Sequence, residues 1–160
     1  MPKQSLFKDK EKIIVYTDGG ARGNPGPAAL GVVIHGPSTM LPRYSSGQVR
    51  AGREYGEFLG TKTNNQAEYA ALIFALKKIK QLIGKKKAKE AEVEVRMDSE
   101  LVVKQMNSEY KIEEPSLQPL FVQVWNLKLD FKSVLFRHIP REQNKRADAM
   151  VNKALDEVLV

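Results

Sequence analysis

Apolar and polar positions along the first sixty residues follow the short, turn-bounded runs of β-strands. Residues 13–17 (IIVYT) are β-branched and aromatic and end at Asp18, Gly19 and Gly20, so the pattern predicts a strand leading into a tight turn. Residues 23–27 (GNPGP) predict an irregular loop. Residues 29–35 and 54–61 read as a second and a third strand. Three successive strands with short connections predict an antiparallel meander.

The hydrophobic period changes to that of an α-helix after residue 63. Apolar residues then recur every three to four positions, at Leu72, Leu76, Ile79 and Ile83. Thr63 and Gln66 have the spacing of a capping box, and Gly84 is a helix stop signal. The sequence therefore predicts a helix from residue 64 to residue 83.

The second half of the chain alternates between helical and strand patterns. Residues 85–89 (KKKAK) predict a solvated linker, residues 92–98 a fourth strand and residues 134–139 a fifth strand. Helices are predicted over residues 100–106, from about residue 116 to 127, and from about residue 144 toward 159. The order β-β-β-α-β-α-α-β-α predicts an α/β fold, a mixed five-stranded sheet with helices on its faces. We expect residues 1–11 to form a flexible leader and residues 12–160 a single domain.

Composition narrows the function. Twenty-six basic against 19 acidic residues leave a net charge of +7, which favours a polyanionic partner such as nucleic acid, although it also serves solubility. The absence of cysteine excludes disulfide frameworks, cysteine zinc sites and thiol catalysis. Neither a membrane span nor a signal peptide is recognisable, so we expect a soluble cytoplasmic protein.

Four acids stand at the ends of predicted elements. Asp18 and Asp98 end strands, while Glu68 and Asp148 lie near the starts of helices. Each has an ordinary structural explanation as a turn residue or a helix-start residue. Glu68, however, shares the inward stripe of the long helix, and an acid held at a packed edge must be paired, protonated or metal-bound. Oxygen ligands without Cys or His suit Mg²⁺ or Mn²⁺, and two such ions suit phosphodiester hydrolysis.

The motifs that carry these acids resemble type 1 ribonuclease H in order and in spacing. They are YTDGG at residues 16–20 with GNPGP at 23–27, TNNQAE at 63–68, DS at 98–99, and HIPREQNKRAD at 138–148. The resemblance implies an endonuclease that hydrolyses the RNA strand of RNA–DNA hybrids with two Mg²⁺ ions, or Mn²⁺. It implies that the metal-binding carboxylates are Asp18, Glu68, Asp98 and Asp148. His138 matches a mobile histidine that assists proton transfer or product release; the alternative is a packing residue that shares a face with Val134 and Phe136.

The same resemblance suggests how the substrate is recognised. Asn24, Asn64 and Asn65 match positions that contact the RNA strand, although asparagine also forms turns and caps helices well. Further candidate substrate contacts are Ser99, Arg141 and Asn144. Residues 109–118 are short and slightly acidic where many bacterial members carry a basic handle, so the sequence resembles the handle-less branch found in archaea and some bacteria. Affinity must then come from other basic residues, with Arg43, Arg50, Arg53, Lys62 and the lysines at 85–89 as candidates.

Two rival functions share this fold. A catalytically silent nucleic-acid-binding module would be expected to lack at least one acid, and all four are present. Another polynucleotide nuclease would share the carboxylates but gives no reason for Asn24, Asn64 and Asn65 together. We expect a monomer with an RNA–DNA hybrid as its partner, no protein partner and no membrane association.

Overall fold

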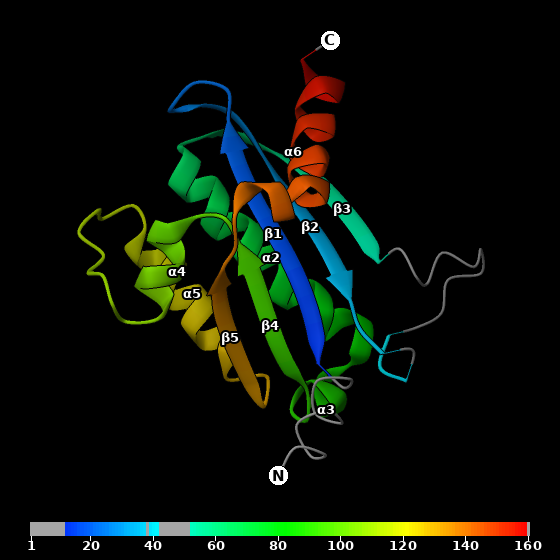
Figure 1. The fold of residues 1–160 in the computed structure, drawn as a ribbon. Helices are drawn as coiled ribbons and strands as arrows, with labels where there is room; N and C mark the ends of the chain where they lie inside the picture. The colour runs from blue at the N-terminus through cyan, green and yellow to red at the C-terminus, as the bar shows by residue number, and fades with distance from the viewer. Residues whose placement is uncertain (1–11, 38, 42–51, 160) are drawn as a thin grey trace.

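The computed structural model describes residues 12–37, 39–41 and 52–159, and its five strands form one mixed sheet (Figure 1). The strands are β1 (Ile13–Ala21), β2 (Gly26–His35), β3 (Arg53–Lys62), β4 (Glu92–Met97) and β5 (Ser133–His138). Their order is β3-β2-β1-β4-β5, with antiparallel pairing from β1 to β3 and parallel pairing of β1, β4 and β5. The predicted fold class is confirmed. The predicted leader, residues 1–11, lies outside the described residues, as do Arg43 and Arg50.

The helices cover the two faces of the sheet unequally. They are α2 (Asn64–Ile83), α3 (Lys85–Ala88), α4 (Glu100–Met106), α5 (Gln118–Lys128) and α6 (Lys145–Val158), with a short 3₁₀ turn η2 (Arg141–Gln143). Helix α2 packs on one face with α5 against it, and α6 packs on the opposite face over β1, β2 and β3 (Figure 1). The prediction of a linker at residues 85–89 is wrong for 85–88, where Ala88 is fully buried and anchors one helical turn.

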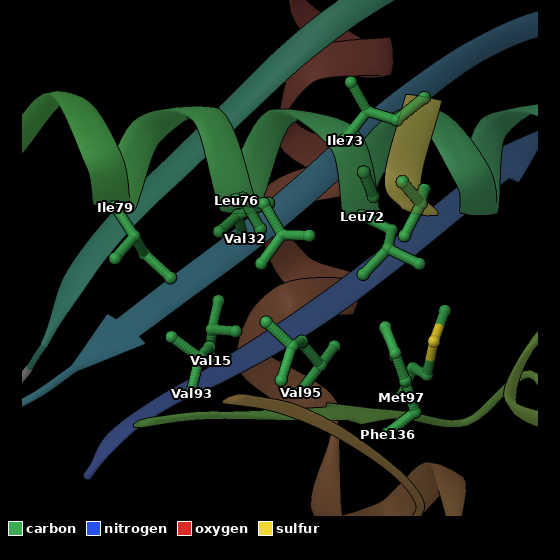
Figure 2. Close-up of a cluster of buried hydrophobic side chains, with 14 of the residues drawn as sticks. Val15, Val32, Leu72, Ile73, Leu76, Ile79, Val93, Val95, Met97 and Phe136 are labelled. Carbon is green, nitrogen blue, oxygen red and sulfur yellow. The ribbon is translucent and has the colours of Figure 1, made fainter. Parts of the chain in front are cut away.

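The main hydrophobic core lies between α2 and the sheet (Figure 2). Leu72 and Leu76 of α2 are fully buried over Val15 of β1 and Val95 of β4. The apolar cluster on the α6 side is much smaller and consists of Ala29, Val151, Ala154 and Leu155. No helix in the described part of the chain is long and apolar enough to cross a membrane.

Helix α2 begins as its sequence predicts. The Thr63 side chain accepts a hydrogen bond from the Gln66 backbone N–H at 3.2 Å, and the Gln66 side chain accepts one from the Thr63 N–H at 2.9 Å. Gly84 follows the last turn with φ of +87°, a conformation that glycine adopts without strain. The helix therefore starts at a fixed point, four residues before Glu68.

The first hairpin is longer than its sequence predicts. β1 does not end at Thr17 but runs through Ala21, and β2 already begins at Gly26. The extra residues are paired, Asp18 opposite Gly31 and Ala21 opposite Ala28, so cross-strand pairing overrides the local turn preference of the Asp-Gly-Gly sequence. Asp18 consequently projects from a strand rather than from a turn.

Candidate active site

Two of the four acids meet where parallel strands diverge. The pairing of β1 with β4 ends at Thr17 and Met97, so Asp18 and Asp98 are the next residues on adjacent strands. The strand β4 stops there, and Glu68 of α2 lines the same cleft as Asp18 and Asp98. Carboxylate oxygens of Asp18, Glu68 and Asp98 lie within 4.8 Å of one another. The structure thus brings together three of the residues predicted as metal ligands.

Gly19 makes the approach of Glu68 possible. A Cβ atom on Gly19 would lie 2.2 Å from the backbone carbon and oxygen of Ala67 and 2.5 Å from the backbone nitrogen of Glu68. Real side chains do not tolerate such distances, so only glycine lets β1 and α2 come this close. The glycine after Asp18 is therefore a requirement for bringing the carboxylates of Asp18 and Glu68 together.

Asp148 arrives from the opposite face of the sheet. Gly31 pairs with Asp18 and with Gly56, which gives a row across β1, β2 and β3. A Cβ on Gly31 would lie 2.0 Å from the Ala147 carbonyl oxygen, and one on Gly56 would lie 2.7 Å from the Met150 carbonyl oxygen. The first turns of α6 therefore rest directly on the sheet. Asp148, in the first turn, joins the other three acids in one cleft of about 370 Å³.

The cluster is electrostatically unfavourable without cations. Burial, together with the charges of Asp98 and Asp148, raises the pKa of Asp18 to about 7. Burial and the charge of Asp18 also raise the pKa of Glu68 well above its usual range. Glu68 Oε2 is buried and has no hydrogen-bond partner among the residues that the structure describes. A buried carboxylate oxygen without a donor is costly, and a hard divalent cation would satisfy it, so the donor set fits such an ion.

Comparisons with known proteins agree with this geometry. A family model described as reverse transcriptase-like matches residues 16–154. The structure of LC11-RNase H1 in complex with an RNA/DNA hybrid is similar, with a TM-score of 0.79, 46% identity and coverage of 93% of this chain and 100% of the other. The RNase H1 structure from Halobacterium salinarum has a TM-score of 0.73 and 38% identity and covers 91% of this chain and 98% of the other.

The chain belongs to the type 1 ribonuclease H family. It is 37% identical over 147 residues to the bifunctional protein Rv2228c of Mycobacterium tuberculosis, which covers 91% of this chain. That match spans only 36% of the length of the mycobacterial protein. The match to ribonuclease HI of Halobacterium salinarum spans 65% of the length of the halobacterial protein. Residues 107–117, between α4 and α5, form no helix, in agreement with the predicted handle-less branch.

His138, for which the resemblance predicts a part in proton transfer or product release, lies at the exposed end of β5. Val134 and Phe136 are buried, but His138, at the end of β5, is exposed. It therefore does not pack with them in the core. It stands three residues before Arg141, which lines the cleft.

Asn24 and Asn64 tie the first hairpin to the start of α2. The Asn24 side-chain oxygen accepts a hydrogen bond from the Asn64 backbone N–H at 3.0 Å, and the Asn64 side-chain oxygen accepts one from the Ala21 N–H at 2.9 Å. Asn64 lines the cleft and is exposed, while the adjacent Asn65 is partly buried. Asn24 and Asn64 therefore do tie the turn to the helix, and both are exposed, with Asn64 lining the cleft of the carboxylates.

The three further substrate candidates occupy different environments. Arg141 is exposed and lines the cleft. Ser99 caps α4, its hydroxyl accepting a hydrogen bond from the Val102 N–H at 3.3 Å. Asn144 is only 1% exposed and donates a 2.9 Å hydrogen bond to the Thr17 carbonyl oxygen. This hydrogen bond connects the start of α6 to β1, and the side chain is buried too deeply to reach a bound duplex.

Several residues of the cleft belong to none of the motifs that resemble ribonuclease H. Arg22 and Asn152 both line the cleft, and Arg22 forms a 2.7 Å ion pair with Asp156 of α6. Asn152 follows Asp148 by four residues, a spacing that places both on one side of a helix, and this signal was present in the sequence. The contacts of Gly31 and Gly56 depend on how α6 crosses the sheet, which local sequence does not specify.

Proposed function

We propose that the chain is an endoribonuclease that hydrolyses the RNA strand of RNA–DNA hybrids with the help of two divalent ions, Mg²⁺ or Mn²⁺. The observation that carries this proposal is the convergence of four carboxylates from β1, α2, β4 and α6 in one cleft. Membership of the ribonuclease H family supports it, as does the similar LC11-RNase H1 that is bound to an RNA/DNA hybrid.

Asp18 has the central position among the proposed metal ligands. Its carboxylate is close to Glu68 and Asp98, and Asp148 contributes to raising its pKa. When bound by these residues, the ions would activate a water molecule and neutralise charge on the leaving oxygen of the phosphodiester. The protein buries Asp18 and Glu68 and brings all four acids to one cleft, where they could share those ions.

Recognition of the hybrid is assigned to the region around the N-terminus of α2. Asn24, Asn64 and Asn65 offer amide groups that can donate to and accept from the RNA 2′-hydroxyl, the group that distinguishes RNA from DNA. Arg22 and Arg141 line the same cleft and can neutralise backbone phosphates near the carboxylates. His138 is proposed to carry a proton to or from the reacting groups. We further propose a cytoplasmic monomer.

The silent-module alternative is less well supported by the geometry. A binding module has no need to concentrate four carboxylates, which repel the phosphates that it must bind. Another polynucleotide nuclease would use the same acids, so substrate preference is the property that separates it from a ribonuclease H.

Cleavage assays with labelled RNA–DNA hybrid, duplex DNA and duplex RNA in Mg²⁺ or Mn²⁺ test the proposal. The wild-type protein should cut the hybrid preferentially. Asp18→Asn should lose about 10³-fold in rate or more, because the shared ligand is removed. His138→Ala should fold normally and slow turnover by roughly a hundredfold. Equal cutting of duplex DNA, or full activity of Asp18→Asn, would show that the proposed function is wrong.

A further inference from the structure

Asp148 differs from the other three acids in how it is held. Asp18 and Glu68 are each 7% exposed and Asp98 is half-buried, whereas Asp148 is exposed on the first turn of α6. The N-cap of that helix, Asn144, makes no capping hydrogen bond with its side chain. Burial therefore orients three of the carboxylates but does not orient the fourth.

One side chain compensates for this exposure. The Asn152 amide nitrogen lies 3.2 Å from the Asp148 carbonyl oxygen and 3.3 Å from Asp148 Oδ2, and it donates to both. The two residues stand one turn apart on α6, and both line the cleft that contains Asp18. One amide group thus links the backbone and the carboxylate of the same residue, which restricts rotation of the Asp148 side chain.

Packing and helix propensity give no other reason for asparagine at this position. Asn152 is exposed, and asparagine in the interior of a helix is a weaker helix former than alanine. Its neighbours in the apolar cluster of α6, Val151 and Leu155, face the sheet instead. The contact with Asp148 is therefore the feature that distinguishes Asn152 from an ordinary surface residue.

We propose that Asn152 is a positioning residue for Asp148. Its amide occupies Oδ2 and leaves Oδ1 available as a metal ligand, so that the exposed carboxylate has a fixed orientation beside the other three acids. This inference rests on the proposed function, because it assigns Asp148 a ligand's role. Partners that orient a metal ligand commonly affect metal affinity or activity by about 10- to 100-fold.

The test compares Asn152→Ala with Asn126→Ala. Asn126 is an exposed residue of α5, so the second variant makes the same chemical change in a helix away from the cleft. Asn152→Ala should lower kcat on the hybrid by roughly tenfold with KM unchanged, and should weaken Mn²⁺ binding to the protein alone, measured by calorimetry, by a similar factor. Asn126→Ala should change neither quantity. An unchanged kcat and Mn²⁺ affinity in Asn152→Ala would overturn the proposal, as would a rise confined to KM, which would indicate direct contact with substrate.

A double-mutant cycle decides whether Asn152 acts through Asp148. In the Asp148→Asn background, Asn152→Ala should have no further effect on Mn²⁺ affinity, because the carboxylate that it orients is gone. A full additional loss would overturn the proposal. If the wild-type protein fails to cut hybrids, the proposed function fails, but the Mn²⁺ comparison still tests the positioning role.

Discussion

The two faces of the sheet bring their acids to the cleft by different means. On the α2 face, Glu68 is carried by a twenty-residue helix whose apolar side is buried in the main core. On the α6 face, Asp148 is carried by a helix with a small apolar cluster of four residues. Both helices come close to the sheet at glycines, Gly19 for α2 and Gly31 with Gly56 for α6.

Polar contacts make up for the smaller core beneath α6. Asn144 donates to the Thr17 carbonyl oxygen at 2.9 Å, and Arg146 donates from Nε to Glu54 at 3.0 Å. Farther along α6, Asp156 forms an ion pair with Arg22, which follows β1. The position of Glu68 is thus coupled to the stability of the whole domain, whereas the position of Asp148 depends on a few separable contacts. Changes on the α2 face should mainly affect folding, and changes on the α6 face should mainly affect activity.

Substituting alanine for Gly19 or Gly31 should reveal the largest difference between the α2 face and the α6 face, in both stability and activity. Gly19→Ala should lower the free energy of unfolding by about 3 kcal/mol or more, because α2 cannot move away without opening the core. Gly31→Ala should cost less stability, about 1–2 kcal/mol, because α6 can shift outward. That shift should reduce cleavage of the hybrid by roughly a hundredfold, since a displacement of 1 Å is enough for such a loss. Urea denaturation and hybrid cleavage measure the two effects.

Gly20→Ala is the matched control for stability. A Cβ on Gly20 meets its nearest atom, Val151 Cγ1, at 3.7 Å, which is an ordinary contact. Its free energy of unfolding should stay within about 0.5 kcal/mol of wild type. Equal losses of stability in Gly19→Ala and Gly31→Ala would show that the two faces do not differ as described.

In the absence of metal, the pH dependence of the free energy of unfolding should reveal the raised pKa values of the buried acids. The pKa of Asp18 is about 7 in the folded protein, against 3.8 for a free side chain. Between about pH 4 and pH 7 the folded protein therefore keeps a proton that the unfolded chain has released, and stability falls as pH rises. The loss should be on the order of 3 kcal/mol, and the raised pKa of Glu68 acts in the same direction.

Thermal denaturation in a metal chelator across this pH range checks that expectation. Glu68→Gln should flatten the curve strongly, because it removes a buried titrating group and a neighbour of Asp18. Asp148→Asn should flatten it less, because an exposed charge is screened by water. A flat curve for the wild-type protein, or a stronger effect of Asp148→Asn, would contradict the distinction between the buried and the exposed acids.

The sequence predicted the parts of this molecule that depend on local pattern. Helix α2 and its capping box follow from Thr63, Gln66 and the spacing of apolar residues, and the structure confirms both. The gathering of Asp18, Glu68 and Asp98 was expected from strand ends and from the inward stripe of the helix, and their oxygens lie within 4.8 Å. Motif order led to the family that the comparisons confirm.

Features that depend on tertiary contact were not predictable in the same way. The extension of β1 through Ala21 requires a partner strand of matching length, and the short helix at residues 85–88 requires a buried site for Ala88. Asn144 is a polar residue of a type usually found in surface loops, yet the approach of α6 to β1 buries it. In each case the deciding contact comes from a segment distant in the sequence.

Arg22 offers the smallest and most specific test of the contacts that hold α6. Its guanidinium lines the cleft and pairs with Asp156, although both side chains are largely exposed, so the pair itself adds little stability. If Arg22 also contacts a phosphate of the hybrid, Arg22→Ala should raise KM modestly. The slope of log affinity against log salt concentration should then become shallower by about 0.9.

Two companion variants separate phosphate binding from the anchoring of α6. Asp156→Ala breaks the same ion pair but keeps the cation, so its salt slope should equal that of wild type. Arg137→Ala removes an exposed arginine of β5 that pairs with Glu94 outside the cleft, and its slope should also be unchanged. Filter binding to the hybrid in a metal chelator measures all three slopes without cleavage. A shallower slope in Asp156→Ala would mean that Arg22 needs its partner to reach the phosphate. A fall in kcat common to Arg22→Ala and Asp156→Ala, with neither slope changed, would mean that the pair serves only to hold α6 and Asp148 in place.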